Sequence, residues 1–300
     1  MGSGTSEECG RDPATGGGAV DRPASASPRR GTVVTDAQRP VAVITGAARG
    51  IGAATAQGLA ADGWRLVLTD RCADDSALGY PLASRDELAA VAVACGGHGV
   101  ALDVVADVRD QQALDSAVAL AVDRFGGLDA AVAVAGCVAG GEPAWSTSDE
   151  TWDTIVRVNL EGTWRLARAA VPALLDRPEP RRGRFVAVSS AGGMVGLPLL
   201  AAYTAAKHGV VGLVRSLAAE LGPYGITANA VAPGSTSTAM LDASATLYDL
   251  VGTSEFATHH LLGRLLDPAE VAALVRWLCS EAATGVTGAL LPVDAGMTAR

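Results

Sequence analysis

The sequence lacks the features that mark several large classes of protein. Its 300 residues carry a net charge of −9, whereas a general nucleic-acid-binding protein is usually basic. No apolar run is long enough to span a bilayer, and the N-terminus has no apolar signal-peptide core. We therefore expect no nucleic-acid partner and no membrane partner.

Cysteine and histidine are scarce and widely spaced. The five cysteines form no CxxC pair, which is typical of reduced thiols in a cytosolic protein. The four histidines show no metal-ligand spacing, because the adjacent pair His259-His260 would diverge on most backbones. These counts predict a cytoplasmic protein with no metal site.

Glycine and apolar residues are abundant, and apolar patterns alternate along most of the chain. Residues 1–38 are rich in Gly, Ser, Pro, Thr and Arg and bury too little to offset their ordering entropy, so we predict a disordered tail. From residue 39 to residue 300, strand patterns alternate with helix patterns, among them 85–94, 111–125, 152–175 and 203–221. This alternation predicts one α/β domain with a Rossmann fold: a doubly wound parallel sheet flanked by helices on both faces, with ligands at the strand carboxyl ends.

The first strand pattern leads directly into a glycine-rich turn. Val41–Thr45 is followed by Gly46-Ala-Ala-Arg-Gly50-Ile-Gly52 and then by a helix pattern. Glycines let the backbone approach a ligand closely, and the free N–H groups of a helix N-terminus favour an anion. The spacing is GxxxGxG, not the GxGxxG of other dinucleotide folds. We expect nucleotide contacts from Gly46, Arg49, Gly50, Ile51 and Gly52.

An acidic residue ends the second strand pattern, about twenty residues after the glycines. Asp70 in this place would accept hydrogen bonds from ribose hydroxyls and repel a 2′-phosphate, which favours NAD over NADP. Arg49 and Arg71 lie close enough in sequence to receive a phosphate instead, and Asp70 could simply cap a turn.

An additional loop follows Asp70. The stretch Cys72–Pro81 precedes the next helix pattern and is longer than the connection requires. Long loops in compact domains are often lids or binding loops. We expect an insert at about 71–90 to cover the adenine half of the nucleotide, which Asp107 and Val108 would contact from the next strand.

A serine, a tyrosine and a lysine form the candidate catalytic group. Ser190 follows an apolar strand pattern, and Tyr203 and Lys207 are one helical turn apart, on one face. A neighbouring ammonium lowers the pKa of a phenol from roughly 10, which makes the tyrosine a usable proton acceptor. The group suits oxidation of an alcohol or reduction of a carbonyl. Tyr and Lys at this spacing are often just surface residues, and the glycine-rich turn tips the balance toward catalysis.

Three further stretches carry expectations about the site and assembly. Asn159 lies inside the 152–175 helix pattern, where an asparagine more often satisfies a backbone carbonyl than takes part in chemistry. The 203–221 pattern is apolar nearly all round, so we expect it to pack against another subunit as well as the sheet. The segment 235–262 is a candidate substrate loop or subunit contact. Its apolar side chains are Met240, Leu241, Leu247, Tyr248, Phe256 and Leu261.

Taken in order, these motifs resemble the short-chain dehydrogenase/reductase family over residues 40–300. The motifs are TGAARGIG at 45–52, Asp70, Asp107-Val108, Asn159, Ser190 with Tyr203-Thr-Ala-Ala-Lys207, and Pro233-Gly234-Ser-Thr-Ser-Thr238. The resemblance implies that Ser190 orients the carbonyl oxygen, that Tyr203 is the acid/base, and that Lys207 holds the nicotinamide ribose. It also implies that Asn159 supports a water in the proton relay. The remaining cofactor contacts that it implies are Ala135, Gly136, Pro233, Gly234, Thr236 and Thr238.

Two details refine the resemblance. The family's usual NNAG after the fourth strand appears as Ala133-Val-Ala-Gly136, so two bracing amides are missing. The insert CADDSALGYPLASRDELAAV, the stretch 177–190 and the stretch 239–266 look like the mycofactocin-dependent branch, whose members keep NAD(H) bound between turnovers. In that branch the insert is thought to cover the cofactor, which the redox carrier mycofactocin re-oxidises in place.

The sequence thus predicts an NAD-dependent alcohol dehydrogenase or carbonyl reductase that acts on a small apolar alcohol or ketone, is coupled to mycofactocin and forms a homotetramer. One alternative is an ordinary alcohol dehydrogenase or 3-oxoacyl/ketone reductase with freely exchanging NAD(P)H. A second is a non-catalytic NAD-binding sensor or scaffold, which we would expect to have lost Tyr203 or Lys207.

Overall fold

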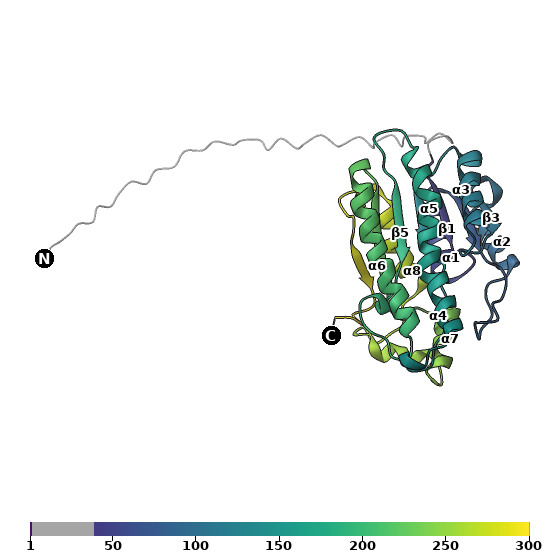
Figure 1. The fold of residues 1–300 in the computed structure, drawn as a ribbon. Coiled ribbons are helices and arrows are strands. Elements are labelled where there is room, and N and C mark those ends of the chain that lie inside the picture. The colour runs from purple at the N-terminus through teal and green to yellow at the C-terminus, as the bar shows by residue number, and fades with distance from the viewer. Residues whose placement is uncertain (2–38, 300) are drawn as a thin grey trace, which may run out of the picture. The chain divides into compact units, whose positions relative to one another are not determined.

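The computed structural model describes Met1 and residues 39–299, so the tail predicted for 1–38 lies, apart from Met1, outside the described residues. Seven parallel strands form one sheet in the order β3-β2-β1-β4-β5-β6-β7 (Figure 1). The strands are β1 (Val41–Thr45), β2 (Arg65–Asp70), β3 (Ala101–Val105), β4 (Ala130–Ala133), β5 (Arg184–Val188), β6 (Thr227–Pro233) and β7 (Leu290–Val293). The predicted fold class is confirmed.

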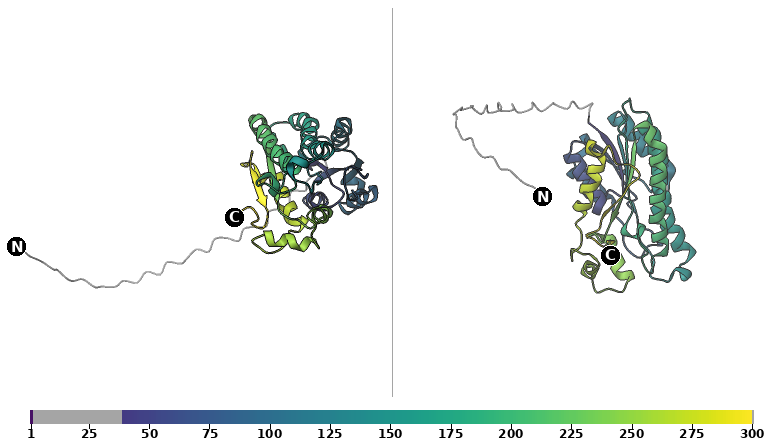
Figure 2. Two further views of the ribbon diagram at one scale, coloured as in Figure 1. Left: turned by 60° about the horizontal axis from the view of Figure 1, so that its bottom comes forward. Right: turned by 90° about the vertical axis from the view of Figure 1, so that its left-hand side faces the viewer.

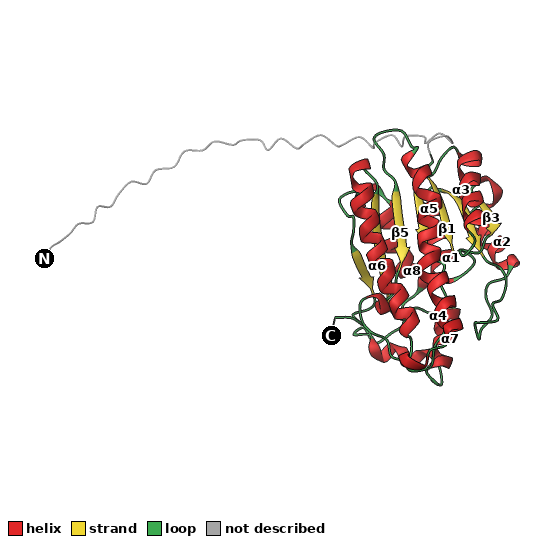
Figure 3. Ribbon diagram, viewed as in Figure 1, coloured by secondary structure: helices red, strands yellow, loops and turns green. Residues whose placement is uncertain are grey.

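Helices connect successive strands, as parallel pairing requires (Figure 3). They are α1 (Gly50–Ala61), α2 (Arg85–Ala94), α3 (Gln111–Phe125), α4 (Asp149–Val156), α5 (Gly162–Leu175), α6 (Ala201–Leu221), α7 (Ala239–Leu247) and α8 (Pro268–Cys279). The bounds of α2 and α3 are those that the sequence patterns predicted. In the described part of the chain no helix is long and apolar enough to cross a membrane.

Two apolar cores separate the sheet from its helices. On one face α1, α2 and α8 pack over Ala42 and Ile44 of β1, and on the other α3, α5 and α6 pack over Val41 and Val43 (Figure 2). Successive side chains of a strand point to opposite faces, so a strand covered on both sides must be apolar throughout. Every residue of β1 is buried for this reason.

The helix predicted over 152–175 is not one regular helix. It begins at Asp149, where Ser148 caps it, and a π-helical turn at Arg157–Glu161 separates α4 from α5. Asn159 sits in that turn and is fully buried. Its side-chain nitrogen donates to the Ile155 carbonyl at 2.9 Å, which satisfies a backbone acceptor as expected. π-Turns inside α-helices frequently occur at functional sites.

The strand order fixes where a ligand can bind. Between β1 and β4 the chain stops adding strands on one side and starts adding them on the other. In open parallel sheets this switch point leaves a crevice at the carboxyl ends of the strands, which is where ligands bind.

Candidate active site

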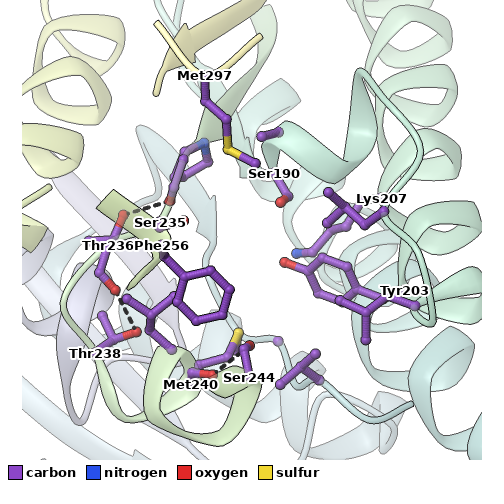
Figure 4. A pocket seen from close by; sticks show the side chains of 18 of the residues that line it. Ser190, Tyr203, Lys207, Ser235, Thr236, Thr238, Met240, Ser244, Phe256 and Met297 are labelled. Carbon is purple, nitrogen blue, oxygen red and sulfur yellow. Dashed lines mark hydrogen bonds between the residues drawn. The ribbon is translucent and has the colours of Figure 1, made fainter. Parts of the chain in front are cut away.

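Ser190, Tyr203 and Lys207 line one cavity of about 620 Å³ at the carboxyl edge of the sheet. Ser190 follows β5, and its hydroxyl accepts a hydrogen bond from the Gly192 N–H at 3.0 Å. Tyr203 and Lys207 lie in the first two turns of α6, and both side chains are buried. In the close-up all three lie on one wall, and Met240 and Phe256 face them across the pocket (Figure 4).

Burial controls the titration of this group. The Lys207 ammonium donates to the Val188 carbonyl at 2.9 Å and lies 5.6 Å from the centroid of the Tyr203 ring. Loss of hydration lowers the pKa of Lys207 to about 8. Burial likewise raises the pKa of Tyr203, and the Ser190 hydroxyl opposes that rise only in part. The sequence predicted that Lys207 would lower this pKa; in the structure burial raises it instead.

Asn159 braces the loop that follows β4. Its side chain accepts from the Cys137 N–H at 3.3 Å and donates to the Cys137 carbonyl at 2.9 Å. A Cβ added to Gly136 would lie 2.8 Å from the side-chain amide oxygen of Asn159 and 3.5 Å from the Lys207 Nζ. Asn159 and Lys207 therefore flank Gly136, which must be glycine to fit between them.

Thr45 supplies bracing where the usual two amides are missing. Its hydroxyl oxygen lies 3.2 Å from the Val134 N–H and 3.3 Å from the Ala135 N–H, and accepts from both. The ends of β1 and β4 are thus joined by a side chain from β1. Thr45 thus holds the end of β4, where Ala133-Val-Ala-Gly136 replaces the family's usual NNAG.

The glycine-rich turn forms a cradle that fits a dinucleotide phosphate. Gly46 has φ +67°, and an added Cβ would lie 2.6 Å from the Ala135 backbone, so only glycine fits this corner. Helix α1 begins directly after the turn, and no side chain caps its first N–H groups. Uncapped N–H groups at a helix N-terminus are the feature that an anionic phosphate requires.

The predicted cofactor contacts come together around this cradle. A second cavity adjoins the first and is lined by residues from the turn and from the ends of β2, β3 and β4. The predicted residues in it are Gly46, Arg49, Gly50, Ile51, Gly52, Asp70, Arg71, Asp107, Val108, Ala135, Gly136 and Thr238. Pro233, Gly234 and Thr236 line the larger cavity instead.

Asp70 is held by backbone donors at the adenosine end of the crevice. Its carboxylate accepts from the Ala48 N–H at 3.1 Å and from the Arg71 N–H at 2.8 Å. It therefore does cap a turn, and it also lines the cavity. Ala48 belongs to the glycine-rich turn, so Asp70 ties the phosphate cradle to the end of β2.

The two arginines that could receive a 2′-phosphate are both engaged by the protein. Arg71 pairs with Asp75 at 2.5 Å and with Asp107 at 3.2 Å, and the Arg49 guanidinium donates to the Pro81 carbonyl at 2.7 Å. Burial would raise the pKa of Asp107, but hydrogen bonds and charge from Arg109, together with Arg71, hold it below its usual range. The carboxylates around these arginines leave a poor site for a second phosphate.

The insert after β2 forms a wall of the nucleotide cavity. Asp75, Leu78, Tyr80 and Leu82 all line it. The Tyr80 hydroxyl accepts a hydrogen bond from the Val138 N–H at 3.1 Å, on the far side of the crevice. Burial raises the pKa of Tyr80, so it stays a neutral phenol. The insert thus reaches across the crevice from β2 to the loop after β4.

The larger cavity has a mostly apolar lining; besides the catalytic group, its polar lining residues include Ser235, Thr236, Thr238, Ser244 and His259. Among its ionisable lining residues are Lys207 and His259, and the lining contains no aspartate, glutamate or arginine of the described chain. The predicted Met240, Leu241, Tyr248 and Phe256 are present, whereas Leu247 and Leu261 are not among the lining residues. Leu261 is 57% exposed.

Several site residues carried no signal in the sequence. Met297, near the C-terminus, lines the large cavity. His260 is buried, and its Nε2 accepts from the Ser235 N–H at 3.0 Å while Nδ1 donates to the Arg264 carbonyl at 2.5 Å. Sequence spacing only argued against the two adjacent histidines as metal ligands. The hydrogen bonds of His260 depend on how segment 235–266 folds back, which no local pattern reports.

Comparison with known proteins relates this chain to known enzymes. A family model described as enoyl-(acyl carrier protein) reductase matches residues 46–298. The (−)-trans-carveol dehydrogenase of Rhodococcus erythropolis is 37% identical over 86% of this chain and 97% of its own. The trans-4-hydroxycyclohexanecarboxylate dehydrogenase of Sinomonas cyclohexanicum is 38% identical over 86% of this chain and 93% of its own.

A solved structure shows the same likeness. The carveol dehydrogenase of Mycobacterium avium, crystallised in complex with NAD, superimposes with a TM-score of 0.81 at 37% identity, covering 87% of this chain and 98% of that one.

Proposed function

Because the chain belongs to the short-chain dehydrogenase/reductase family, we propose that it is an NAD-dependent alcohol dehydrogenase that interconverts a small apolar alcohol and its carbonyl compound. The observation that carries this function is the convergence of Ser190, Tyr203 and Lys207 on a cavity that adjoins the glycine-rich cradle. A hydroxyl, a phenol and an ammonium beside a dinucleotide site are the groups that hydride transfer from an alcohol requires.

The mechanism assigns one task to each side chain. NAD, when bound, supplies the acceptor for the hydride that leaves the carbinol carbon. Tyr203 takes the hydroxyl proton, and Ser190 hydrogen-bonds the same oxygen as it becomes a carbonyl oxygen. Lys207 places positive charge beside the phenol, which favours the phenolate over the phenol. Asn159, which holds the loop after β4 beside Lys207, supports the water through which the proton leaves.

Preference for NAD follows from the charges at the adenosine end. Asp70 and Asp107 line the cavity where a 2′-phosphate would lie, and Arg71 is neutralised by its two carboxylate partners. The relative of known structure was crystallised with NAD. Arg49, the other arginine that lines this cavity, donates to the Pro81 carbonyl.

The substrate that suits the larger cavity is a neutral apolar alcohol. A cavity whose described lining has no arginine offers an anionic substituent only Lys207 and His259 as partners. This favours a substrate of the kind named for the carveol dehydrogenases over a hydroxy acid.

Tight retention of NAD and its re-oxidation by mycofactocin form the finer part of the proposal. The support is that insert residues Leu78 and Tyr80 wall the nucleotide cavity and that Tyr80 is hydrogen-bonded across the crevice. Three ion pairs and the bond from Arg49 to Pro81 hold the insert in that position. An insert fastened at both sides would slow the release of a bound dinucleotide.

We also place the protein in the cytoplasm as a homotetramer. Cys72, Cys95, Cys137 and Cys279 are free thiols, which suits a reducing compartment. The support for assembly is the exposed tryptophan of α5, Trp164.

One experiment separates these readings. The purified, desalted protein is denatured and its supernatant assayed for NAD(H), and the native protein is tested on a neutral secondary alcohol with either added NAD or an artificial electron acceptor. We expect near-stoichiometric NAD, turnover with the artificial acceptor, and no steady-state turnover on free NAD. Empty protein that turns over freely with NAD would instead identify an ordinary dehydrogenase.

The variant Tyr203→Phe tests the chemistry in the same assay. It should retain bound NAD and lose alcohol oxidation by about a hundredfold or more, because proton transfer is removed while the cavity keeps its shape. The matched control is Tyr224→Phe, which alters an exposed tyrosine away from both cavities. Full activity in Tyr203→Phe would refute the mechanism, and binding without any activity in the wild type would favour a sensor.

A further inference from the structure

The residues after β7 form a turn that a single carboxylate holds together. Asp294 accepts hydrogen bonds from the Gly296 N–H at 2.9 Å, from the Thr298 N–H at 2.9 Å and from the Thr298 hydroxyl at 2.5 Å. The Met297 N–H donates to the Asp294 carbonyl at 2.9 Å. Ala295 and Gly296 have φ values of +50° and +83°, so the backbone reverses sharply here. The turn is therefore a built structure and not a frayed end.

This turn is also locked against the end of the substrate segment. The Leu262 N–H donates to the Ala295 carbonyl at 3.2 Å. A Cβ on Gly296 would lie 2.8 Å from the Leu261 side chain, so that side chain packs closely against the Gly296 backbone. Asp294 itself is only 8% exposed. These contacts hold the backbone on which Met297 lies, directly after Gly296.

Met297 is directed into the large cavity. It lines the cavity together with Ser190 and lies on the same rim in the close-up (Figure 4). Thr298 points away from the cavity, and its hydroxyl lies 3.9 Å from the sulfur of Met194, which is not among the lining residues. The thioether of Met297 thus occupies space over the hydroxyl that would hold the reacting oxygen.

We propose that Met297 is a specificity-determining residue that limits the size of the substituent next to the carbinol carbon, and that Asp294 is the positioning residue that holds it there. The inference rests on the proposed alcohol dehydrogenase function and narrows its substrate class to neutral secondary alcohols whose neighbouring ring position carries at most a small substituent. A methionine is a flexible apolar side chain that fills an irregular gap. Its removal should open room for a bulky neighbour and gain nothing for a slender substrate.

The test compares two alcohols on matched variants. Values of kcat/KM for cyclohexanol and 2-tert-butylcyclohexanol are measured on the holoenzyme with an artificial electron acceptor. Met297→Ala should raise the ratio of bulky to slender substrate by about tenfold or more, since a few methylene groups in an apolar pocket discriminate by 10–200-fold. Met194→Ala removes the same side chain just outside the cavity and should leave the ratio unchanged.

A double-mutant cycle tests the role of Asp294. Asp294→Ala should shift the ratio in the same direction as Met297→Ala, and in the Met297→Ala background it should add nothing further. An independent effect of Asp294→Ala on the ratio in that background would show that it does not act through Met297. Met297→Leu keeps the apolar volume and should retain the wild-type ratio, which separates loss of size from loss of folding.

Binding of the two ketones separates failure of this inference from failure of the proposed function. Calorimetric titration with cyclohexanone and 2-tert-butylcyclohexanone needs no turnover. If the wild type binds cyclohexanone but oxidises no alcohol, the proposed function fails and the ratio of ketone affinities still tests Met297. If both alcohols change equally in Met297→Ala, in turnover and in binding, Met297 does not set substrate size.

Discussion

Lys207 is a buried cation whose partner is a carbonyl group. Its exposed fraction is 4%, its ammonium donates to Val188, and within residues 39–299 no salt bridge to it is formed. Burial lowers its pKa from 10.5 to about 8. In the proposed mechanism this costly group supplies positive charge beside the Tyr203 phenol.

The stability of the protein should therefore depend on pH through Lys207. Between about pH 8 and about pH 10 the unfolded chain still binds the Lys207 proton while the folded state loses it, so the wild type gains stability as pH rises. Lys207→Met removes that dependence. We expect the difference in unfolding free energy, variant minus wild type, to fall across this window by up to about 1.4 kcal/mol per pH unit. A pH-independent difference measured by calorimetry would contradict the assigned shift.

At the scale of elements, two departures from regular structure shape the site. The π-turn at Arg157–Glu161 aims Asn159 at Cys137, where an uninterrupted α-helix would place it differently. The insert between β2 and α2 then crosses the crevice to the same loop, where Tyr80 accepts from the Val138 N–H. The π-turn and the insert therefore both make hydrogen bonds that hold the loop after β4.

Removing one hydroxyl should loosen the insert. In Tyr80→Phe the Val138 N–H loses its acceptor, which costs about 1–3 kcal/mol when the group is buried. Because about 1.4 kcal/mol corresponds to tenfold in an equilibrium, we expect bound NAD to be released about tenfold faster or more. The release rate is measured by rapid desalting followed by an assay of retained NAD. Tyr224→Phe is the control, and an unchanged release rate in Tyr80→Phe would mean that Leu78 and the ion pairs hold the insert alone.

At the scale of the whole molecule, the outer surface of one helical layer is incompletely covered. Trp152 of α4 and Trp164 of α5 are 44% and 43% exposed, and Arg165 and Arg168 each place a guanidinium 5.7 Å from the Trp164 ring. Val210, Val214 and Leu221 of α6 are buried within the domain, so its inner face is already used. The outer face of this layer is the one that the proposed assembly would bury.

Trp164→Glu tests that assembly. Burying a carboxylate in place of an apolar ring at a subunit interface carries a desolvation cost even with Arg165 and Arg168 beside it, so the variant should dissociate from the tetramer to smaller species. Light scattering coupled to size-exclusion chromatography measures the mass directly. Trp145→Glu, at an 89% exposed tryptophan outside α4–α6, should keep the wild-type mass. A monomeric wild type would rule out the homotetramer.

The fold class and the placement of the glycine-rich turn and of Tyr203 with Lys207 were predictable from the sequence alone. Strands buried on both faces must be continuously apolar, a phosphate corner needs glycine, and Tyr203 and Lys207 share a helix face through their spacing alone. Each of these is a local requirement that a short stretch of residues reports directly. The bounds of α2 and α3 followed in the same way from their periodicity and caps.

The Tyr203 pKa and several contacts of the site depend on the tertiary structure. The Tyr203 pKa rises where a neighbouring lysine predicted a fall, because burial depends on every element around α6. Thr45 replaces two missing amides, His260 holds Ser235, and Met297 enters the cavity from the far end of the chain. These contacts join residues that are 25 to 107 positions apart, and such pairs leave no periodicity or spacing for a sequence pattern to show.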